Sequence, residues 1–250
     1  MDGIELMCLQ IRRCETEGIG ILCCPEGILG GLADNHPNPS ELALSSGMLK
    51  ETLLPLASDS VTSIVGFSEV ERGGRIYNSA AVFHRGEIVG LYRKLHPAIR
   101  HSVYSAGCQV PVFTVADLKF GIVICNDSNY RELASLMARQ GATALFVPTN
   151  NALNPKKGGA ELIAHARKCD IAAAVENGMW VIRADVAGDL GDLVSYGSSG
   201  IVDPQGLVVR SARQMNEDLL IAEIDTRPGA QQRGLNSRRD NFSVAHPNWS

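Results

Sequence analysis

Features that would place this chain in several other classes of protein are missing from its sequence. No apolar segment approaches the ~20 residues that a membrane-spanning helix needs, and the first residues lack the basic and apolar segments of a secretory signal. No lysine and arginine block is present that could neutralise phosphates, the nearest being the pair Arg238 and Arg239. We therefore expect a cytoplasmic protein that binds neither nucleic acid nor membrane. Its partners should be small molecules or copies of itself.

The cysteines also lack the pattern of a disulfide framework. They number seven, an odd count, and two of them, Cys23 and Cys24, are adjacent. These two point to opposite faces of a strand, so a redox-sensing pair built from them and Cys125 is a less favoured interpretation. His96 and His101 have no second His or Cys at metal-ligand spacing, and we expect no metal site.

Length and composition fit a globular enzyme. Hydrophobic residues make up 45% of the chain and charged residues 20%, which is typical of a soluble protein rather than a disordered or fibrous one. A chain of 250 residues can bury a large core as one domain. We expect a single domain over 1–250, in which the polar, Arg-rich residues 226–250 form an irregular C-terminal extension.

Short runs rich in isoleucine and valine alternate with helical patterns, which predicts an α/β fold. Two hairpins, in 79–93 and 200–211, favour a mixed sheet or a pair of sheets. The expected helices are 5–17, 40–57, 130–140 and 158–177, the third with Asp127 or Ser128 as N-cap. The expected strands are 20–24, 63–67, 79–84, 87–93, 112–115, 119–125, 144–148, 180–185, 200–203, 208–211 and 219–223.

Three of these strands end in a residue capable of chemistry. The first delivers Glu26, the strand ending at Arg93 delivers Lys94, and the run Gly121–Ile124 delivers Cys125. Each residue alone is more often a packing or surface residue. Because strand ends in α/β sheets open onto one crevice, we expect the carboxylate, the ammonium and the thiol to converge.

Together these groups suit acyl transfer. A thiol at the start of a helix, close to an ammonium, is favoured as thiolate. A carboxylate could take its proton and pass it to a leaving amine. The ammonium and the backbone N–H of Asn126 could then stabilise an oxyanion.

Five segments in order resemble the motifs of the nitrilase, or carbon-nitrogen hydrolase, superfamily. They are CPEG at 24–27, YRKLHP at 92–97, ICND at 124–127, ENGMWVIRAD at 176–185 and SYGSSGIVDPQG at 195–206. The resemblance implies a four-layer α-β-β-α sandwich that dimerises through a helical face. It also implies a triad in which Glu26 is the general base and acid, Lys94 stabilises the oxyanion and Cys125 is the nucleophile. No metal and no organic cofactor is required by the implied mechanism.

The sequence departs from the family pattern in three places. Many members carry a second glutamate where this chain has Arg100 or His101. Ser128 and Asn129 replace the arginines with which carbamoyl-amino-acid hydrolases hold a substrate carboxylate, although Arg131 or Arg100 could still bind an anion. The usual first strand is expected to be missing, because residues 1–10 already read as helix, and Met1 could lie after the natural start.

The sequence leaves the substrate open. The leading hypothesis is hydrolysis of a small amide or ω-amide to a carboxylic acid and ammonia through a thioester. Asn150, Asn151 and Tyr130 are candidates for the substrate pocket, although turn-forming roles are as common for the two asparagines. Nitrile hydrolysis and N-carbamoyl hydrolysis would use the same triad. A catalytically weakened member that binds a ligand or partner is the alternative from another class.

Overall fold

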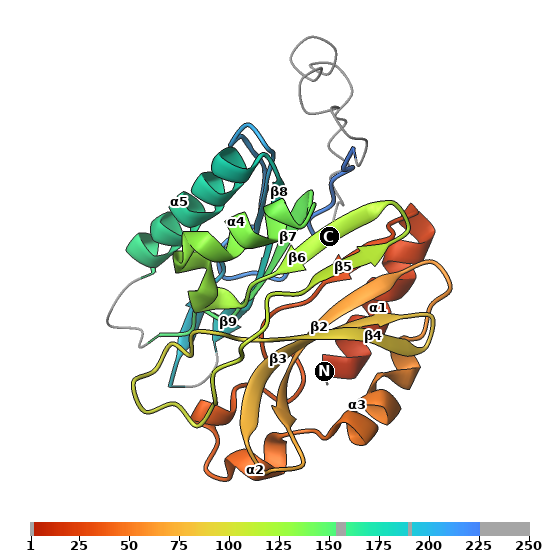
Figure 1. The fold of residues 1–250 in the computed structure, drawn as a ribbon, viewed down its shortest axis with the longest axis vertical. Helices are drawn as coiled ribbons and strands as arrows, with labels where there is room; N and C mark the ends of the chain where they lie inside the picture. The colour runs from red at the N-terminus through yellow and green to blue at the C-terminus, as the bar shows by residue number, and fades with distance from the viewer. Residues whose placement is uncertain (1–2, 154–158, 190–191, 226–250) are drawn as a thin grey trace, which may run out of the picture.

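The computed structural model describes residues 3–153, 159–189 and 192–225, and its two main sheets face each other (Figure 1). In the first sheet the order is β1 (Ile21–Cys23), β2 (Thr62–Val70), β3 (Ile76–His84) and β4 (Glu87–Arg93). In the second it is β12 (Val208–Ser211), β11 (Gly200–Val202), β8 (Trp180–Asp185), β7 (Ala144–Thr149), β6 (Leu118–Ile122) and β5 (Val112–Val115). Parallel pairs β6–β7 and β7–β8 combine with antiparallel hairpins, so the predicted mixed sheets are confirmed.

Helices cover the outer face of each sheet. Helices α1 (Gly3–Glu17) and α3 (Ser46–Leu53) contribute buried side chains to a cluster with the first sheet. Helices α4 (Arg131–Arg139) and α5 (Ala160–Asn177) lie over the second sheet (Figure 1). The layers therefore run α-β-β-α, and the fold expected from the sequence is confirmed.

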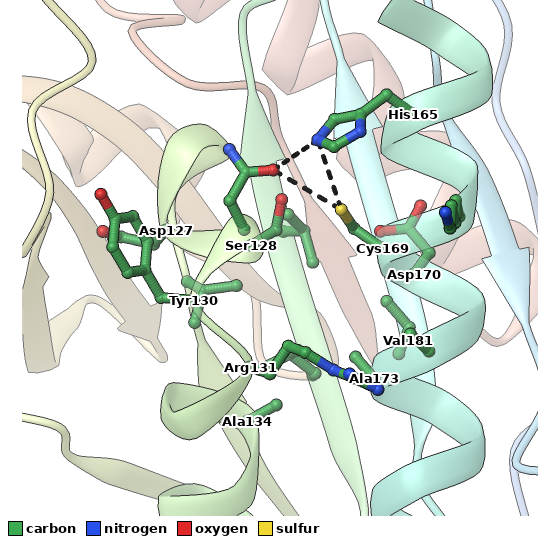
Figure 2. A pocket seen from close by; sticks show the side chains of 16 residues that line it. Asp127, Ser128, Tyr130, Arg131, Ala134, His165, Cys169, Asp170, Ala173 and Val181 are labelled. Carbon is green, nitrogen blue, oxygen red and sulfur yellow. Dashed lines mark hydrogen bonds between the residues drawn. The ribbon is translucent and has the colours of Figure 1, made fainter.

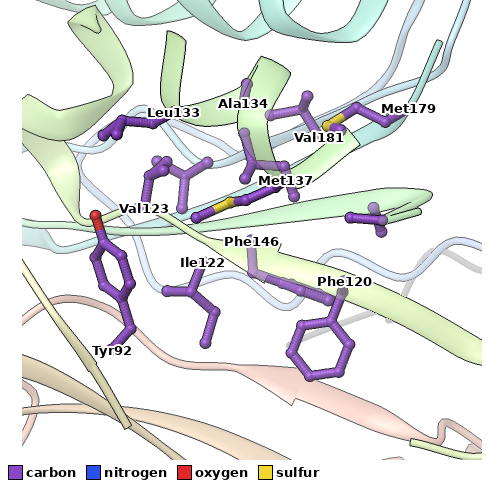
Figure 3. Close-up of a cluster of buried hydrophobic side chains, with 14 of the residues drawn as sticks. Tyr92, Phe120, Ile122, Val123, Leu133, Ala134, Met137, Phe146, Met179 and Val181 are labelled. Atoms are coloured by element: carbon purple, nitrogen blue, oxygen red, sulfur yellow. The ribbon is translucent and has the colours of Figure 1, made fainter. Parts of the chain in front are cut away.

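The core follows from strand geometry, because successive side chains of a strand point to opposite faces. On β2, Val65 and Phe67 pack with the helices of the first sheet, while Ile64, the residue before Val65, faces the second sheet. Figure 3 shows the second sheet, with Ile122 on the side of the first sheet and Met137 of α4 on the helix side. Burial on both faces explains why the central strands read as nearly continuous apolar runs.

The single helix expected over 40–57 is wrong. The structure has α2 (Pro39–Leu42), then an extended segment, then α3 and the 3₁₀ helix η2 (Leu54–Leu56). Leu44 interrupts the helix because its backbone N–H donates to Ser68 and its carbonyl accepts from Val70, which extends the first sheet. Ser45 then caps α3 by accepting a hydrogen bond from the backbone N–H of Met48.

The expected caps of the helix after Cys125 are also wrong. Residues Cys125–Asn129 form a separate 3₁₀ helix, η3, and Tyr130 precedes α4 without a side-chain cap. Asp127 is occupied elsewhere, with hydrogen bonds from the backbone N–H groups of Ile124, Leu95 and His96. The predicted stop is consistent with the structure, since Gly141 after α4 has a φ of +93°, a conformation that glycine adopts without strain.

The strand expected over 219–223 does not form, and a hairpin that the pattern did not indicate does. An apolar run becomes a strand only where a sheet edge pairs with it, and Leu219 instead packs its side chain against the cluster of α1 and the first sheet. The additional hairpin joins β9 (Ala187–Asp189) to β10 (Val194–Tyr196). These strands have only three residues each, too few for a recognisable hydrophobic pattern.

Three further expectations concern the chain ends, metals and membranes. Helix α1 begins at Gly3 and no strand precedes it in the described part. The predicted extension 226–250 and residue Met1 lie outside the described residues. Within the described ranges no group of three or more His, Cys, Asp or Glu side chains could hold a metal ion, and no helix is long and apolar enough to cross a membrane.

Candidate active site

Two of the three strand-end residues are in direct contact. Glu26 follows β1 and Lys94 follows β4, and the Lys94 Nζ lies 2.6 Å from the Glu26 Oε1. Both side chains are at most 5% exposed. Cys125 comes from the second sheet, at the start of η3, and its charge state is coupled electrostatically to both residues. The structure therefore brings together the groups that the sequence placed at separate strand ends.

The position of Glu26 depends on a glycine in the neighbouring strand. A Cβ added at Gly66 of β2 would lie 2.6 Å from the Pro25 carbonyl oxygen and 2.9 Å from the Glu26 Cα. These atoms belong to the backbone and cannot rotate away. Gly66 thus allows the turn that carries Glu26 to lie directly on β2.

Glu26 is held by three donors. Its Oε1 accepts hydrogen bonds from the Lys94 Nζ and from the Asn78 Nδ2, the latter at 2.7 Å. Its Oε2 accepts the backbone N–H of Asn150 at 2.9 Å. A carboxylate fixed in this way keeps one orientation, as a group that transfers protons to a defined position requires.

Lys94 remains charged despite its burial. Burial disfavours the ammonium and is the largest single influence, but the opposing contributions, led by the charge and hydrogen bond of Glu26 and including Asp127, together outweigh it. The net result raises the pKa of Lys94 above its ordinary value. A fixed ammonium in a dry site can stabilise a developing oxyanion.

Cys125 has a strained backbone and a protonated thiol. Its φ of +46° lies in the left-handed region, which is unusual for a residue other than glycine. The Ser128 hydroxyl donates to the Cys125 carbonyl at 2.7 Å and supports this turn. Burial, and secondly the Glu26 carboxylate, raise the pKa of the thiol to about 12, although Lys94 and Arg183 oppose them. Burial and Glu26 thus oppose the thiolate that the helix start and the ammonium favour, and attack by this thiol needs a base, the role expected of the carboxylate.

Asp127 links the cysteine turn to the lysine loop. Its buried carboxylate accepts the Tyr92 hydroxyl at 2.7 Å and the backbone N–H of His96 at 2.8 Å. The Ile124 N–H, just before Cys125, is a further donor. One side chain thus fixes the positions of the residues on either side of the site. The sequence suggested only a helix cap for it, because long-range hydrogen bonds leave no local pattern.

A buried arginine beneath the site was not singled out from the sequence. Arg183 on β8 forms a two-pronged ion pair with Asp170 of α5, with a shortest contact of 2.6 Å. It also donates to the Ser128 hydroxyl at 3.1 Å, and that hydroxyl in turn holds the Cys125 carbonyl. Arg183 therefore supports the strained turn through Ser128. An arginine within the apolar strand 180–185 was the signal that could have identified it.

Asn151 lies beside the thiol. The Cys125 Sγ donates to the Asn151 Oδ1 at 3.6 Å. The Asn151 Nδ2 donates to the Asp185 carboxylate and to the Ser198 hydroxyl. Asp185 is 7% exposed and also accepts the backbone N–H of Asn151, so it fixes this asparagine in place. Asp185 and Ser198 were not predicted as site residues.

The other sequence candidates have different surroundings. The Asn150 side-chain oxygen accepts a hydrogen bond from the backbone N–H of Ala152, which is the local bond of a turn-forming asparagine. The backbone N–H of Asn150 donates to Glu26. The Asn126 side chain donates to the His96 carbonyl at 3.0 Å. Tyr130 is partly exposed and stacks on the His96 ring, with ring centroids 3.5 Å apart.

The segment in which a second glutamate was missing is exposed. Arg100 and His101 are both on the surface. Arg131, the other residue considered for binding an anion, is paired with Glu176 on α5. Besides Glu26, the carboxylate that acts electrostatically on Lys94 is Asp127.

A cavity of about 230 Å³ opens between α4 and α5. Figure 2 shows residues of η3 on one side and of α5 on the other. Asp127 and Ser128 of η3 line it, while the lining contains none of Glu26, Lys94 and Cys125. This cavity is therefore separate from the candidate triad.

Exchanging Gly66 for alanine tests the placement of Glu26. We expect Gly66→Ala to lose most hydrolytic activity, because the new Cβ would displace the backbone that carries the carboxylate. Gly20→Ala is the matched control, since a Cβ there meets nothing within 4 Å. Turnover and thermal unfolding would be measured for both. Wild-type turnover in folded Gly66→Ala would contradict the proposed dependence.

Comparison with known proteins gives the family. The family model described as "Carbon-nitrogen hydrolase" matches residues 2–232. The chain is 30% identical to omega-amidase NIT2-A of Xenopus laevis, over 90% of this chain and 83% of that protein. It is 29% identical to a nitrilase of Pyrococcus abyssi, over 86% of this chain and 80% of the other.

Solved structures agree on the fold. A carbon-nitrogen hydrolase from Helicobacter pylori G27 superposes with a TM-score of 0.74 at 23% identity, covering 84% of this chain and 79% of that one. The model match covers most of the chain, and a curated relative reaches 30% identity over most of its length. This protein belongs to the carbon-nitrogen hydrolase family and acts as a hydrolase on carbon-nitrogen bonds.

Proposed function

We propose that the protein hydrolyses a small amide, of the ω-amide type, to a carboxylic acid and ammonia through a thioester on Cys125. The observation that carries this proposal is the buried contact of Glu26 with Lys94 beside a protonated thiol. The omega-amidase relatives support an amide substrate.

Acylation begins with proton transfer. Glu26 takes the thiol proton while the Cys125 Sγ forms a bond to the amide carbon. The oxyanion that results is stabilised by the Lys94 ammonium and by the Asn126 backbone N–H. Glu26 then gives the proton to the amide nitrogen, the carbon-nitrogen bond breaks, and ammonia leaves. Because the thiol pKa of about 12 leaves it protonated at neutral pH, this sequence needs the carboxylate as its base.

Deacylation repeats the same steps with water. Glu26 takes a proton from water, the hydroxide adds to the thioester carbon, and the sulfur leaves as the carbon-sulfur bond breaks. The proton returns from Glu26 to the sulfur, and the carboxylic acid is released. Proton and charge balance over the cycle, and the mechanism uses no metal or organic cofactor.

Asn78 is a further candidate for a residue that contacts the substrate during acylation. Its Nδ2 donates to Glu26, while its Oδ1 is buried and has no hydrogen-bond partner. A buried carbonyl without a partner is costly, so a ligand that donates a hydrogen bond there would be favoured. We assign it as an acceptor for an N–H of the substrate amide or of the departing ammonia.

Asp127 is a candidate for the lysine-orienting role of the second glutamate that this sequence lacks. Its carboxylate fixes the loop after Lys94 through the N–H groups of Leu95 and His96 and raises the pKa of Lys94 through space. We propose that it orients the lysine in this chain. This role would let Glu26 act as the one carboxylate that exchanges protons with substrate.

The proposal is tested with a panel of short amides, ω-amides, nitriles and carbamoyl compounds. Intact-protein mass is recorded after mixing, and ammonia is quantified in parallel. We expect a covalent adduct on Cys125 and ammonia release from the amides, with both lost in Cys125→Ala. Adducts from nitriles or carbamoyl compounds alone would favour those reactions. No adduct and no ammonia from folded protein would support a ligand-binding role without turnover.

Assembly as a homodimer through a helical face and a cytoplasmic location stay predictions.

A further inference from the structure

A second cluster of reactive side chains lies at the cavity between α4 and α5, outside the proposed triad. His165 and Cys169 are four residues apart on α5, a spacing that places them on one helix face. The Cys169 Sγ lies 3.6 Å from the His165 Nε2. The Asn129 Oδ1, from the end of η3, lies 2.7 Å from that nitrogen and 3.5 Å from the sulfur. Dashed lines in Figure 2 mark these contacts of His165 and Cys169. Sulfur, nitrogen and oxygen thus converge on one point.

This arrangement does not suit a second nucleophile. A catalytic relay uses the two ring nitrogens separately, one for the thiol and one for the group that orients the ring. Here the same nitrogen of His165 faces both Cys169 and Asn129. Burial also raises the pKa of the Cys169 thiol, which makes it a poor nucleophile at neutral pH. Convergence on a shared point fits a common ligand instead.

We propose that Cys169, His165 and Asn129 bind a divalent transition-metal ion of the zinc class. A metal about 2.3 Å from sulfur and 2.0–2.1 Å from nitrogen, with a tetrahedral angle, separates those atoms by roughly 3.6 Å. The observed separation of the Cys169 Sγ and the His165 Nε2 is 3.6 Å. Thiolate and imidazole are the donors that zinc and its neighbours prefer.

The third donor needs only a small adjustment. Tetrahedral coordination would place oxygen and nitrogen about 3.4 Å apart, against the present 2.7 Å between the Asn129 Oδ1 and the His165 Nε2. Both side chains are on the surface and can separate without repacking the core. The Asn129 Nδ2 donates to the Asn126 Oδ1 at 2.9 Å, which turns the amide oxygen toward α5. A water molecule or a small ligand would complete the coordination.

The charge needed for a cation at this point comes from the Cys169 thiolate. Arg131 forms a neutral pair with Glu176, while Asp170 pairs with both Arg183 and Arg167 and so leaves one positive charge in excess. Lys168 also lines the cavity and opposes a cation. The thiol offsets this charge because it binds as thiolate and releases its proton to solvent. With two strong donors and one amide, we expect exchangeable binding that strengthens as pH rises.

Titration with Co²⁺ tests the site, because a thiolate bound to Co²⁺ gives a charge-transfer absorption band. The background is the full chain with Cys125→Ser, which removes the other thiol beside η3. We expect one Co²⁺ per chain, displaced by Zn²⁺, and affinity at least about tenfold weaker in Cys169→Ser and His165→Ala. Cys108→Ser is the matched control, since Cys108 is exposed and lies outside this cavity lining, and it should bind as the background does.

Asn129→Asp provides a gain of function. A carboxylate in place of the amide should tighten Co²⁺ binding, because it adds a negative donor at the same position. No thiolate band in the background protein would overturn the proposal. So would a band that persists in Cys169→Ser or disappears in Cys108→Ser. Thermal unfolding of each variant confirms that lost binding is not lost folding.

Discussion

Lys94→Ala is expected to lower kcat by about two to three orders of magnitude, the usual effect of removing an oxyanion-stabilising group. The ammonium of Lys94 is buried against Glu26 and keeps its charge there. Since the charge on the amide oxygen develops only during the reaction, the loss should appear in kcat rather than in KM. Steady-state kinetics on the preferred amide, identified from the substrate panel, provide the measurement.

A stability effect must be separated from this catalytic effect. Removing one partner of a buried ion pair leaves the other charge uncompensated, which destabilises the fold. The double variant Lys94→Ala with Glu26→Gln removes both charges, so its thermal unfolding should lie closer to wild type than that of Lys94→Ala. Lys50→Ala is the matched control, because Lys50 forms an exposed ion pair with Glu87. Near wild-type turnover in folded Lys94→Ala would rule out the triad.

Glu26→Gln is expected to lower turnover by about two to four orders of magnitude, since both acylation and deacylation lose their proton carrier. The same change should lower the pKa of the Cys125 thiol, because the Glu26 charge is the second contribution that raises it, after burial. The positive charges of Lys94 and Arg183 would then favour the thiolate with less opposition. A catalytically damaged enzyme would thus carry a more reactive cysteine.

Alkylation of Cys125 as a function of pH tests this pair of effects. Loss of a negative neighbour lowers a thiol pKa, so the midpoint of alkylation should move to lower pH in Glu26→Gln, with faster alkylation at pH values below the wild-type midpoint. Peptide mass spectrometry identifies the alkylated cysteine. Glu132→Gln, at an exposed glutamate of α4, is the control and should leave both turnover and the midpoint unchanged. An unchanged midpoint in Glu26→Gln, or rapid turnover, would count against the role given to Glu26.

Local pattern was sufficient for most of the fold. Strands β4, β5 and β8 have the bounds that apolar alternation and flanking turns predicted. Where the pattern misled, a distant contact decided the outcome. Leu44 pairs with the first sheet and so interrupts the helix expected over 40–57. The run 219–223 has the composition of a strand but does not form one.

Ordered motifs likewise singled out Glu26, Lys94 and Cys125 as candidates, because each follows an apolar strand at a turn and strand ends meet in α/β folds. The supporting residues could not be found in this way. Asp127 is joined to Tyr92 and Asp185 to Asn151 by hydrogen bonds across tens of residues, and such bonds leave no periodicity in the sequence.

The sequence by itself determined the α/β class, the family and the residues that carry the candidate chemistry, since these depend on composition, local hydrophobic period and motif order. Only the tertiary structure decided the burial and the protonation of those residues. Burial beside Glu26 keeps the Cys125 thiol protonated, although its place at the start of a helix and near a lysine suggested a thiolate. The reason is physical: desolvation and the distances between charges are properties of the packed interior, and they arise only when segments far apart in the chain come together.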